Sequence, residues 1–141
     1  MNEYQLDNIR RSFDAASERS EDFADRFYAR LFAMQPVLRA ILPRDHWQRE
    51  RDLIAAVGMM VKGLGKLDSI QHPLMDFGAK AERTGITPQQ YGLARQALVS
   101  ALRETLAEQW TDDLENDWTE ALNTVASVVV LGAGRSRARA A

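Results

Sequence analysis

The stretch that decides the fold reads Phe77-Gly78-Ala79-Lys80-Ala81-Glu82-Arg83-Thr84-Gly85-Ile86-Thr87-Pro88-Gln89-Gln90-Tyr91. Apolar residues leading into it recur at alternating three- and four-residue steps, which predicts one buried face of a helix: Leu67, Ile70, Leu74, Phe77 and Ala81. Gly85 can supply a left-handed C-cap, and Thr87 and Gln90 form a capping box with proline at the first helical position. Local chemistry therefore predicts where one helix ends and the next begins.

Helical spacing continues over nearly the whole chain, and no stretch has the alternation of a strand. Three polar residues precede apolar runs and are expected to start helices, namely Ser20, Asp45 and Thr111. Glycines at 63 and 65, and again at 132 and 134, are expected to end helices. The expected helices cover about residues 6–16, 20–34, 36–42, 46–62, 67–84, 88–108 and 112–131. Six or seven helices with short connections predict an all-α fold.

Length and composition set the class of protein. A chain of 141 residues fits one domain, expected over residues 1–134, followed by a disordered basic tail over 135–141. The formal net charge of −2 gives no indication of a nucleic-acid surface. The absence of cysteine excludes disulfides, thiolate metal ligands and thiol nucleophiles. The polar, acidic start argues against a secretory signal, and no run is long enough to cross a bilayer, so a cytoplasmic protein is expected.

The order and spacing of several motifs resemble bacterial globins and the globin domains of flavohaemoglobins. The ending Gly85 to Tyr91 is similar to the family's turn into its sixth long helix, and Phe27 to Pro36 resembles its Phe-Tyr-x-x-Leu-Phe-x-x-x-Pro segment. Trp118 with Ala121 and Ala126 resembles its last helix. The resemblance runs from about residue 5 to 131 and implies a globin-like fold.

The same resemblance implies a haem site with important residues replaced. Ala81 stands where the family keeps the proximal histidine that binds iron, and Leu42 replaces a phenylalanine that wedges the haem. On the distal side, Tyr28 matches the tyrosine that contacts a bound gas, while Arg49 falls at the glutamine or histidine position. Two further matches are Leu53, one turn along the distal pocket, and the proximal-side Tyr91.

Each of these residues also has a purely structural interpretation. Tyr28 on an aromatic helix face is typical of a core tyrosine with a local hydrogen-bond partner, and Arg49 is typical of a solvated helix residue. His46 at a helix entrance suits a surface role, and His72 lies too far along its helix to replace Ala81. The two histidines lack metal-ligand spacing, so no metal site is predicted. No nucleophile, phosphate loop or acid–base pair indicates an enzyme.

Two functions remain open from the sequence. The first is a haem-free globin-fold regulatory, sensor or interaction module, which resembles non-haem globin domains of bacterial signalling proteins. That resemblance implies a homodimer through the last two long helices, a signalling partner in trans and an apolar ligand such as a fatty acid, whose carboxylate Arg49 could meet. The alternative is a haem globin that binds oxygen or another diatomic gas through an unorthodox axial ligand.

Overall fold

Seven α-helices and one 3₁₀ turn make up the described part of the chain. The computed structural model describes the backbone of residues 1–140 and the side chains of residues 1–132 and 134. The elements in order are α1 (Glu3–Ser17), α2 (Ser20–Met34), α3 (Leu38–Ile41), α4 (His46–Gly63), α5 (Leu67–Arg83), α6 (Pro88–Leu106), η1 (Ala107–Gln109) and α7 (Asp112–Ala140). Over residues 1–140 no strand occurs, so the predicted all-α class and the helix count are confirmed.

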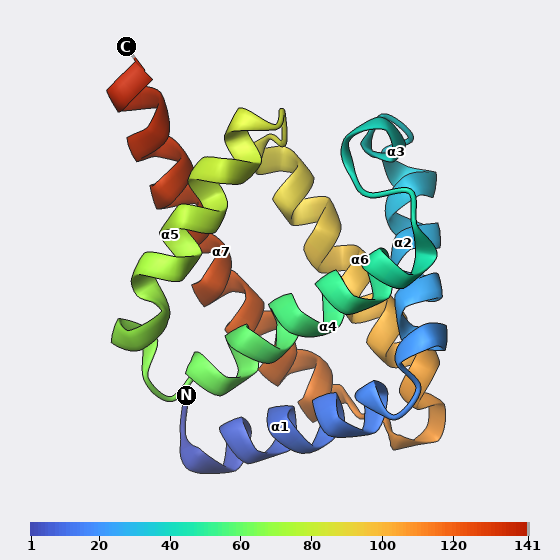
Figure 1. Ribbon diagram of the computed structural model, residues 1–141. Coiled ribbons are helices and arrows are strands. Elements are labelled where there is room, and N and C mark those ends of the chain that lie inside the picture. The colour runs from blue at the N-terminus through green and yellow to red at the C-terminus, as the bar shows by residue number, and fades with distance from the viewer. Residues whose placement is uncertain (141) are drawn as a thin grey trace.

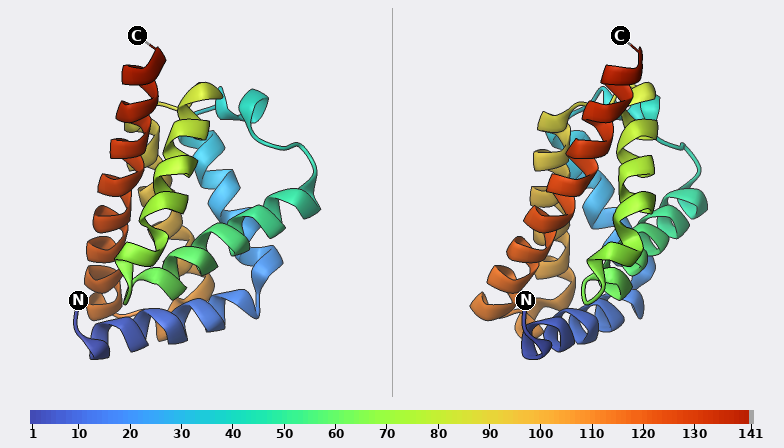
Figure 2. Two further views of the ribbon diagram at one scale, coloured as in Figure 1. Left: turned by 60° about the vertical axis from the view of Figure 1, so that its left-hand side comes forward. Right: turned by 90° about the vertical axis from the view of Figure 1, so that its left-hand side faces the viewer.

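Two helix pairs form the body of the molecule, and two further helices cross them. The most extensive packing joins α5 to α7 and α2 to α6. Figure 1 shows α4 passing diagonally across the front of both pairs, with α1 running beneath them. The turned views in Figure 2 show the same arrangement, with the short α3 and its connection to α4 at the edge of the molecule. Residues 35–45 therefore form a peripheral bridge between α2 and α4.

The predicted boundary between α5 and α6 is confirmed in detail. The amide of Ile86 donates to the carbonyl of Ala81 at 3.0 Å, and the amide of Gly85 donates to the carbonyl of Glu82 at 3.0 Å. This is the Schellman pattern, and Gly85 has the positive φ of +99° that it requires. Thr87 then closes a capping box with the third residue of α6, as the sequence predicts.

Two other predicted helix ends need correction. Ser20 is not the N-cap of α2, because its hydroxyl donates to the Glu50 carboxylate at 2.5 Å instead of accepting a backbone amide. The last helix does not stop at Gly132 but continues to Ala140. A glycine inside a helix costs only about 1 kcal/mol, and Gly132 lies where α7 meets the backbone of Met75 in α5. Its small size serves close packing. Ala141, the end of the predicted disordered tail, lies outside the described residues.

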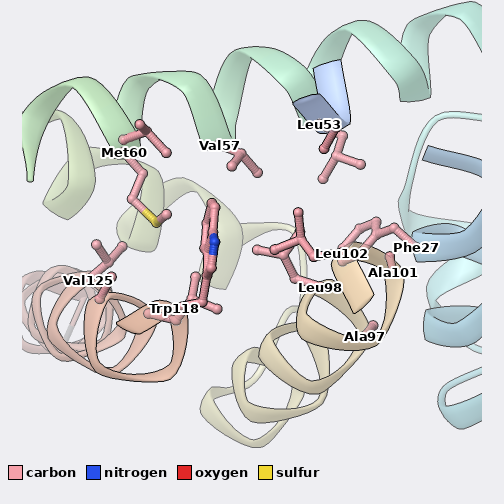
Figure 3. Close-up of a cluster of buried hydrophobic side chains, with 14 of the residues drawn as sticks. Phe27, Leu53, Val57, Met60, Ala97, Leu98, Ala101, Leu102, Trp118 and Val125 are labelled. Carbon is pink, nitrogen blue, oxygen red and sulfur yellow. The ribbon is translucent and has the colours of Figure 1, made fainter. Parts of the chain in front are cut away.

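The core is formed where α4 crosses α6 and α7. Figure 3 shows Val57 and Met60 pointing from α4 toward the indole of Trp118 on α7. Trp118 is fully buried, and its Nε1 donates to the hydroxyl of Ser12 on α1 at 2.9 Å. That hydroxyl donates in turn to the carbonyl of Ile9. This relay satisfies the polar edge of the indole. The aromatic face of α2 that carries Tyr28 is likewise buried at Phe23, Phe27 and Phe32.

Two positions of the predicted α5 stripe differ from their expectation. Phe77 is 49% exposed and Leu67, at the start of the helix, is 37% exposed, although the stripe predicts that both face inward. The stripe itself is confirmed at Ile70, Leu74 and Ala81, which are all buried. Phe77 lines an open pocket, which leaves part of its ring exposed to solvent. No helix over the described residues is long and apolar enough to cross a membrane.

Candidate functional site

An apolar pocket lies among the four long helices α4, α5, α6 and α7. It has a volume of about 200 Å³ and is partly enclosed. Its walls are almost wholly hydrocarbon and are formed by Phe27, Leu53, Ala56, Val57, Met59, Met60, Leu74, Phe77, Ala94, Leu98, Leu122, Val125, Ala126 and Val129. Two further lining residues, Tyr91 and Arg95, carry polar atoms, and both come from the first two turns of α6. An apolar concave site with few polar groups is typical of small-molecule binding.

The sequence-predicted site residues divide into those that line this pocket and those that do not. Leu53 and Tyr91 line it. Ala81 is buried in the last turn of α5 and is not among the lining residues. Leu42 is half-buried in the peripheral bridge and is also outside the pocket. Residue 81 thus offers the pocket no atom that could bind a metal.

Tyr28 and Arg49 lie together, but outside the pocket. The Tyr28 hydroxyl donates to the Arg49 carbonyl at 3.2 Å, and the ring packs edge-on to Phe27. Burial, with a smaller contribution from the charge of Asp52, raises the pKa of Tyr28 to about 12. The phenol therefore stays neutral and has a local partner, which matches the structural interpretation of a core tyrosine.

The Arg49 side chain is held against the bridge between α2 and α4. Its Nε donates to the Pro43 carbonyl at 2.5 Å. Its guanidinium lies 4.8 Å from the centroid of the Phe32 ring and 5.7 Å from that of Tyr28. Arg49 thereby ties the bridge to α2. In this arrangement its charge does not face the apolar pocket, so a ligand there would meet a different cation.

That cation is Arg95, which sequence reasoning did not single out. Arg95 lines both the apolar pocket and a more polar groove between α6 and α7. One Nη donates to Asn123 on α7, while Nε is buried and has no hydrogen-bond partner among the described residues. The signal was present in the sequence, because Arg95 follows Tyr91 by four residues and so shares its helix face.

The donor set of the pocket does not fit a haem held by histidine. His72 is exposed on α5, and exposed His46 lies beside Glu21 and Asp25 at the start of α4. Neither imidazole lines the pocket. The pocket is lined by the thioethers of Met59 and Met60 and by the phenol of Tyr91. Methionine and tyrosine side chains ligate haem iron in other proteins. An axial bond would have to come from one of these.

Fold and pocket together define an all-α protein whose long helices surround an apolar pocket. The globin family model matches residues 25–129, and the chain belongs to the globin family. The flavohemoprotein of Rhizobium meliloti is 26% identical over 106 residues, which cover 73% of this chain and 26% of that protein. This chain spans less than a third of the length of the curated relatives it matches.

Two solved structures with the same fold give the comparison in three dimensions. A hexacoordinated heme protein from an anhydrobiotic tardigrade superimposes with a TM-score of 0.84 at 15% identity, covering 94% of this chain and 95% of the other. A bacterial globin from Campylobacter jejuni gives a TM-score of 0.82 at 14% identity, covering 95% and 97%. The structural similarity establishes the globin fold that the sequence predicts. Because the sequence identities are low, the ligand has to be inferred from the residues of the pocket.

Proposed function

We propose that this chain is a haem-free globin-fold module that binds an apolar ligand with an acidic head in the pocket between α4, α5, α6 and α7. The observation that carries the proposal is the combination of an apolar pocket with an alanine at the proximal position. Ala81 is buried and cannot bind iron, and no histidine lines the pocket. The hydrophobic walls remain, so the site keeps its affinity for hydrocarbon.

The lining of the pocket gives a reason for it to be filled. The pocket has a volume of about 200 Å³ and opens to solvent, and its walls are almost wholly hydrocarbon. Water would find few hydrogen-bond partners against these walls. A hydrocarbon chain that enters gains about 25 cal/mol for each Å² of apolar surface removed from water. An alkyl or small aromatic guest suits both the volume and the lining.

Arg95 supports an acidic head group on that guest. Its Nε is buried and without a hydrogen-bond partner among the side chains that the structure describes, on a residue that borders the pocket. A carboxylate that accepts from Nε and a neighbouring Nη would form the two-point contact that arginine makes well. Arg95 takes the role that the sequence suggested for Arg49, because Arg49 is committed to Pro43 and the rings of α2.

Titration with octanoate and 1-octanol, followed by heteronuclear NMR, tests this proposal. We expect both to shift signals of pocket residues and octanoate to bind about tenfold or more tightly, the value of a charge-assisted hydrogen bond. Arg95→Gln should abolish that preference and leave octanol binding unchanged, whereas Arg103→Gln, on the same helix but outside the pocket, should preserve it. Ala94→Trp should block both ligands. No binding of either compound would overturn the proposal.

Haem is the second candidate, and the relatives favour it more than a haem-free role. Proteins similar to the chain include flavohemoproteins and a heme protein. The specific observation on its side is that Met59, Met60 and Tyr91 line the pocket. Against it stands the donor set, which contains no imidazole. We therefore keep it as the alternative, with haem bound by a thioether or phenolate.

Addition of hemin to the purified protein separates the two candidates. Under the haem-free proposal the wild-type Soret band stays that of free hemin, and Ala81→His creates or strengthens a haem site. Stoichiometric binding by the wild type would establish the alternative. If Ala81→His folds and still binds no haem, then residue 81 does not face the iron position.

We further infer that the module regulates other proteins and is not itself an enzyme. No pair of acid and base lines the pocket, whose polar atoms belong to Tyr91 and Arg95. A homodimer through α6 and α7 and a signalling partner in trans stay predictions. Light scattering over a range of concentrations measures the first, and a monomer at high concentration would contradict it.

A further inference from the structure

A second cluster of side chains lies outside the pocket, at the corner where α2 and α4 begin. Glu21 and Asp25 are four residues apart and share one face of α2, and His46 is the first residue of α4. Asp45, which accepts from the Trp47 amide at 3.0 Å, caps α4 and fixes the position of His46. The corner is therefore built by two separate helix starts.

The distances within this cluster suit a metal ion. His46 Nδ1 lies 3.2 Å from Asp25 Oδ1, and the other ring nitrogen, Nε2, lies 3.7 Å from Glu21 Oε1, so a single ion would take one of the two nitrogens. One ligand atom from each of the three residues falls within 4.8 Å of the others. Ligands at Zn–N and Zn–O distances of about 2.1 Å in a tetrahedron stand roughly 3.4 Å apart. All three side chains are exposed, so small rotations bring them to that spacing.

The surroundings of the cluster favour a cation. Glu21 and Asp25 also line a surface hollow that includes three other carboxylates, those of Glu18, Asp22 and Glu50. The hollow's one arginine, Arg19, directs an Nη to the carbonyl of Thr105. Glu50 adds an independent observation, because one of its carboxylate oxygens is buried and has no hydrogen-bond partner among the described residues. It lies one helical turn after His46 on α4.

We propose that His46, Asp25 and Glu21 bind one divalent transition-metal ion of the Zn²⁺ type, with Glu50 supporting the site from the hollow. An imidazole with carboxylates selects such ions over Mg²⁺ and Ca²⁺, which prefer oxygen ligands throughout. Three protein ligands leave coordination positions to water. The bound ion would link α2 directly to α4, the two helices that residues 35–45 connect. The site is independent of the apolar pocket.

Isothermal titration of untagged protein with ZnCl₂ tests the site. We expect one equivalent of zinc to bind. His46→Ala and Asp25→Asn should each raise the dissociation constant about tenfold or more, because loss of a residue that only supports a metal ligand already lowers metal affinity by that factor. His72→Ala is the matched control, because His72 is exposed on α5 outside this corner, and should leave binding unchanged. Zinc should also raise the unfolding temperature of the wild type and not that of His46→Ala.

Three results would overturn the site. The first is the absence of saturable binding at one equivalent in the wild type. The second is binding that His46→Ala leaves unchanged, or that His72→Ala weakens equally. The third is displacement of zinc by millimolar MgCl₂, which would mean that oxygen ligands alone hold the ion. Circular dichroism of each metal-free variant separates a lost ligand from a lost fold.

Discussion

The close approach of α5 and α7 at Gly132 gives a sharp test of the structure. A Cβ built on Gly132 lies 2.5 Å from the Cα and 2.6 Å from the carbonyl carbon of Met75, with the carbonyl oxygen closer still. Carbon atoms pack best at about 3.5–4.0 Å, so α5 must move away from α7 by about 1 Å to admit a methyl group. The contact is with backbone, and no side-chain rotation can relieve it.

The magnitude follows from two opposing contributions. Alanine gains about 1 kcal/mol over glycine inside a helix, while overpacking of a rigid contact costs typically 1–3 kcal/mol and occasionally more. Because the contact is with backbone, we place the cost at about 2–3 kcal/mol. We therefore expect Gly132→Ala to lower the free energy of unfolding by about 1–2 kcal/mol, or the melting temperature by roughly 3–8 °C for a chain of this size. It should also loosen the pocket, because α5 and α7 supply several of its walls.

Gly58→Ala is the matched control. A Cβ on Gly58, in the interior of α4, lies 3.6 Å from the ring of Phe13, which is ordinary van der Waals contact. The same chemical change should therefore raise the free energy of unfolding by about 0.5–1 kcal/mol. Urea unfolding followed by circular dichroism measures both variants. If Gly132→Ala is as stable as the wild type or more stable, α5 and α7 do not approach as closely as described.

Two further predictions concern buried polar groups. Because burial raises the pKa of Tyr28 from 10.0 to about 12, the folded state holds this proton more tightly, so stability should fall from about pH 10 to 12. The fall should be absent in Tyr28→Phe, whose free energy of unfolding at neutral pH should be lower by about 1 kcal/mol because the hydrogen bond to Arg49 is lost. Urea unfolding at each pH measures both effects. An equal fall with pH in both proteins would show that Tyr28 is not the group responsible. Ser12→Ala should cost about 1–3 kcal/mol, because it leaves the buried Trp118 N–H without its acceptor. Ser69→Ala, which removes only an exposed local hydrogen bond, should stay within about 0.5 kcal/mol in the same assay.

Much of the helical framework could be predicted because its determinants are local. The cap at Gly85, the capping box at Thr87 and the N-cap at Asp45 each depend on residues within a few positions. The same spacing correctly placed Ala81 on the buried side of α5. Local sequence patterns predicted helix ends wrongly where a residue contacts a partner far away in the chain. Ser20 donates to Glu50 instead of capping α2, and Gly132 accommodates α5 instead of ending α7.

From the sequence by itself, helical periodicity predicted an all-α fold, and the order and spacing of the motifs predicted a globin-like fold with alanine at position 81, where the resemblance implies a proximal histidine. The tertiary structure alone decided which polar groups reach the pocket. It directs Arg49 toward Pro43 and brings Arg95 to the apolar walls, and it joins His46 to Asp25 across two helices. Periodicity gives the face on which a residue lies, but the neighbour opposite that face depends on how helices far apart in the chain pack together.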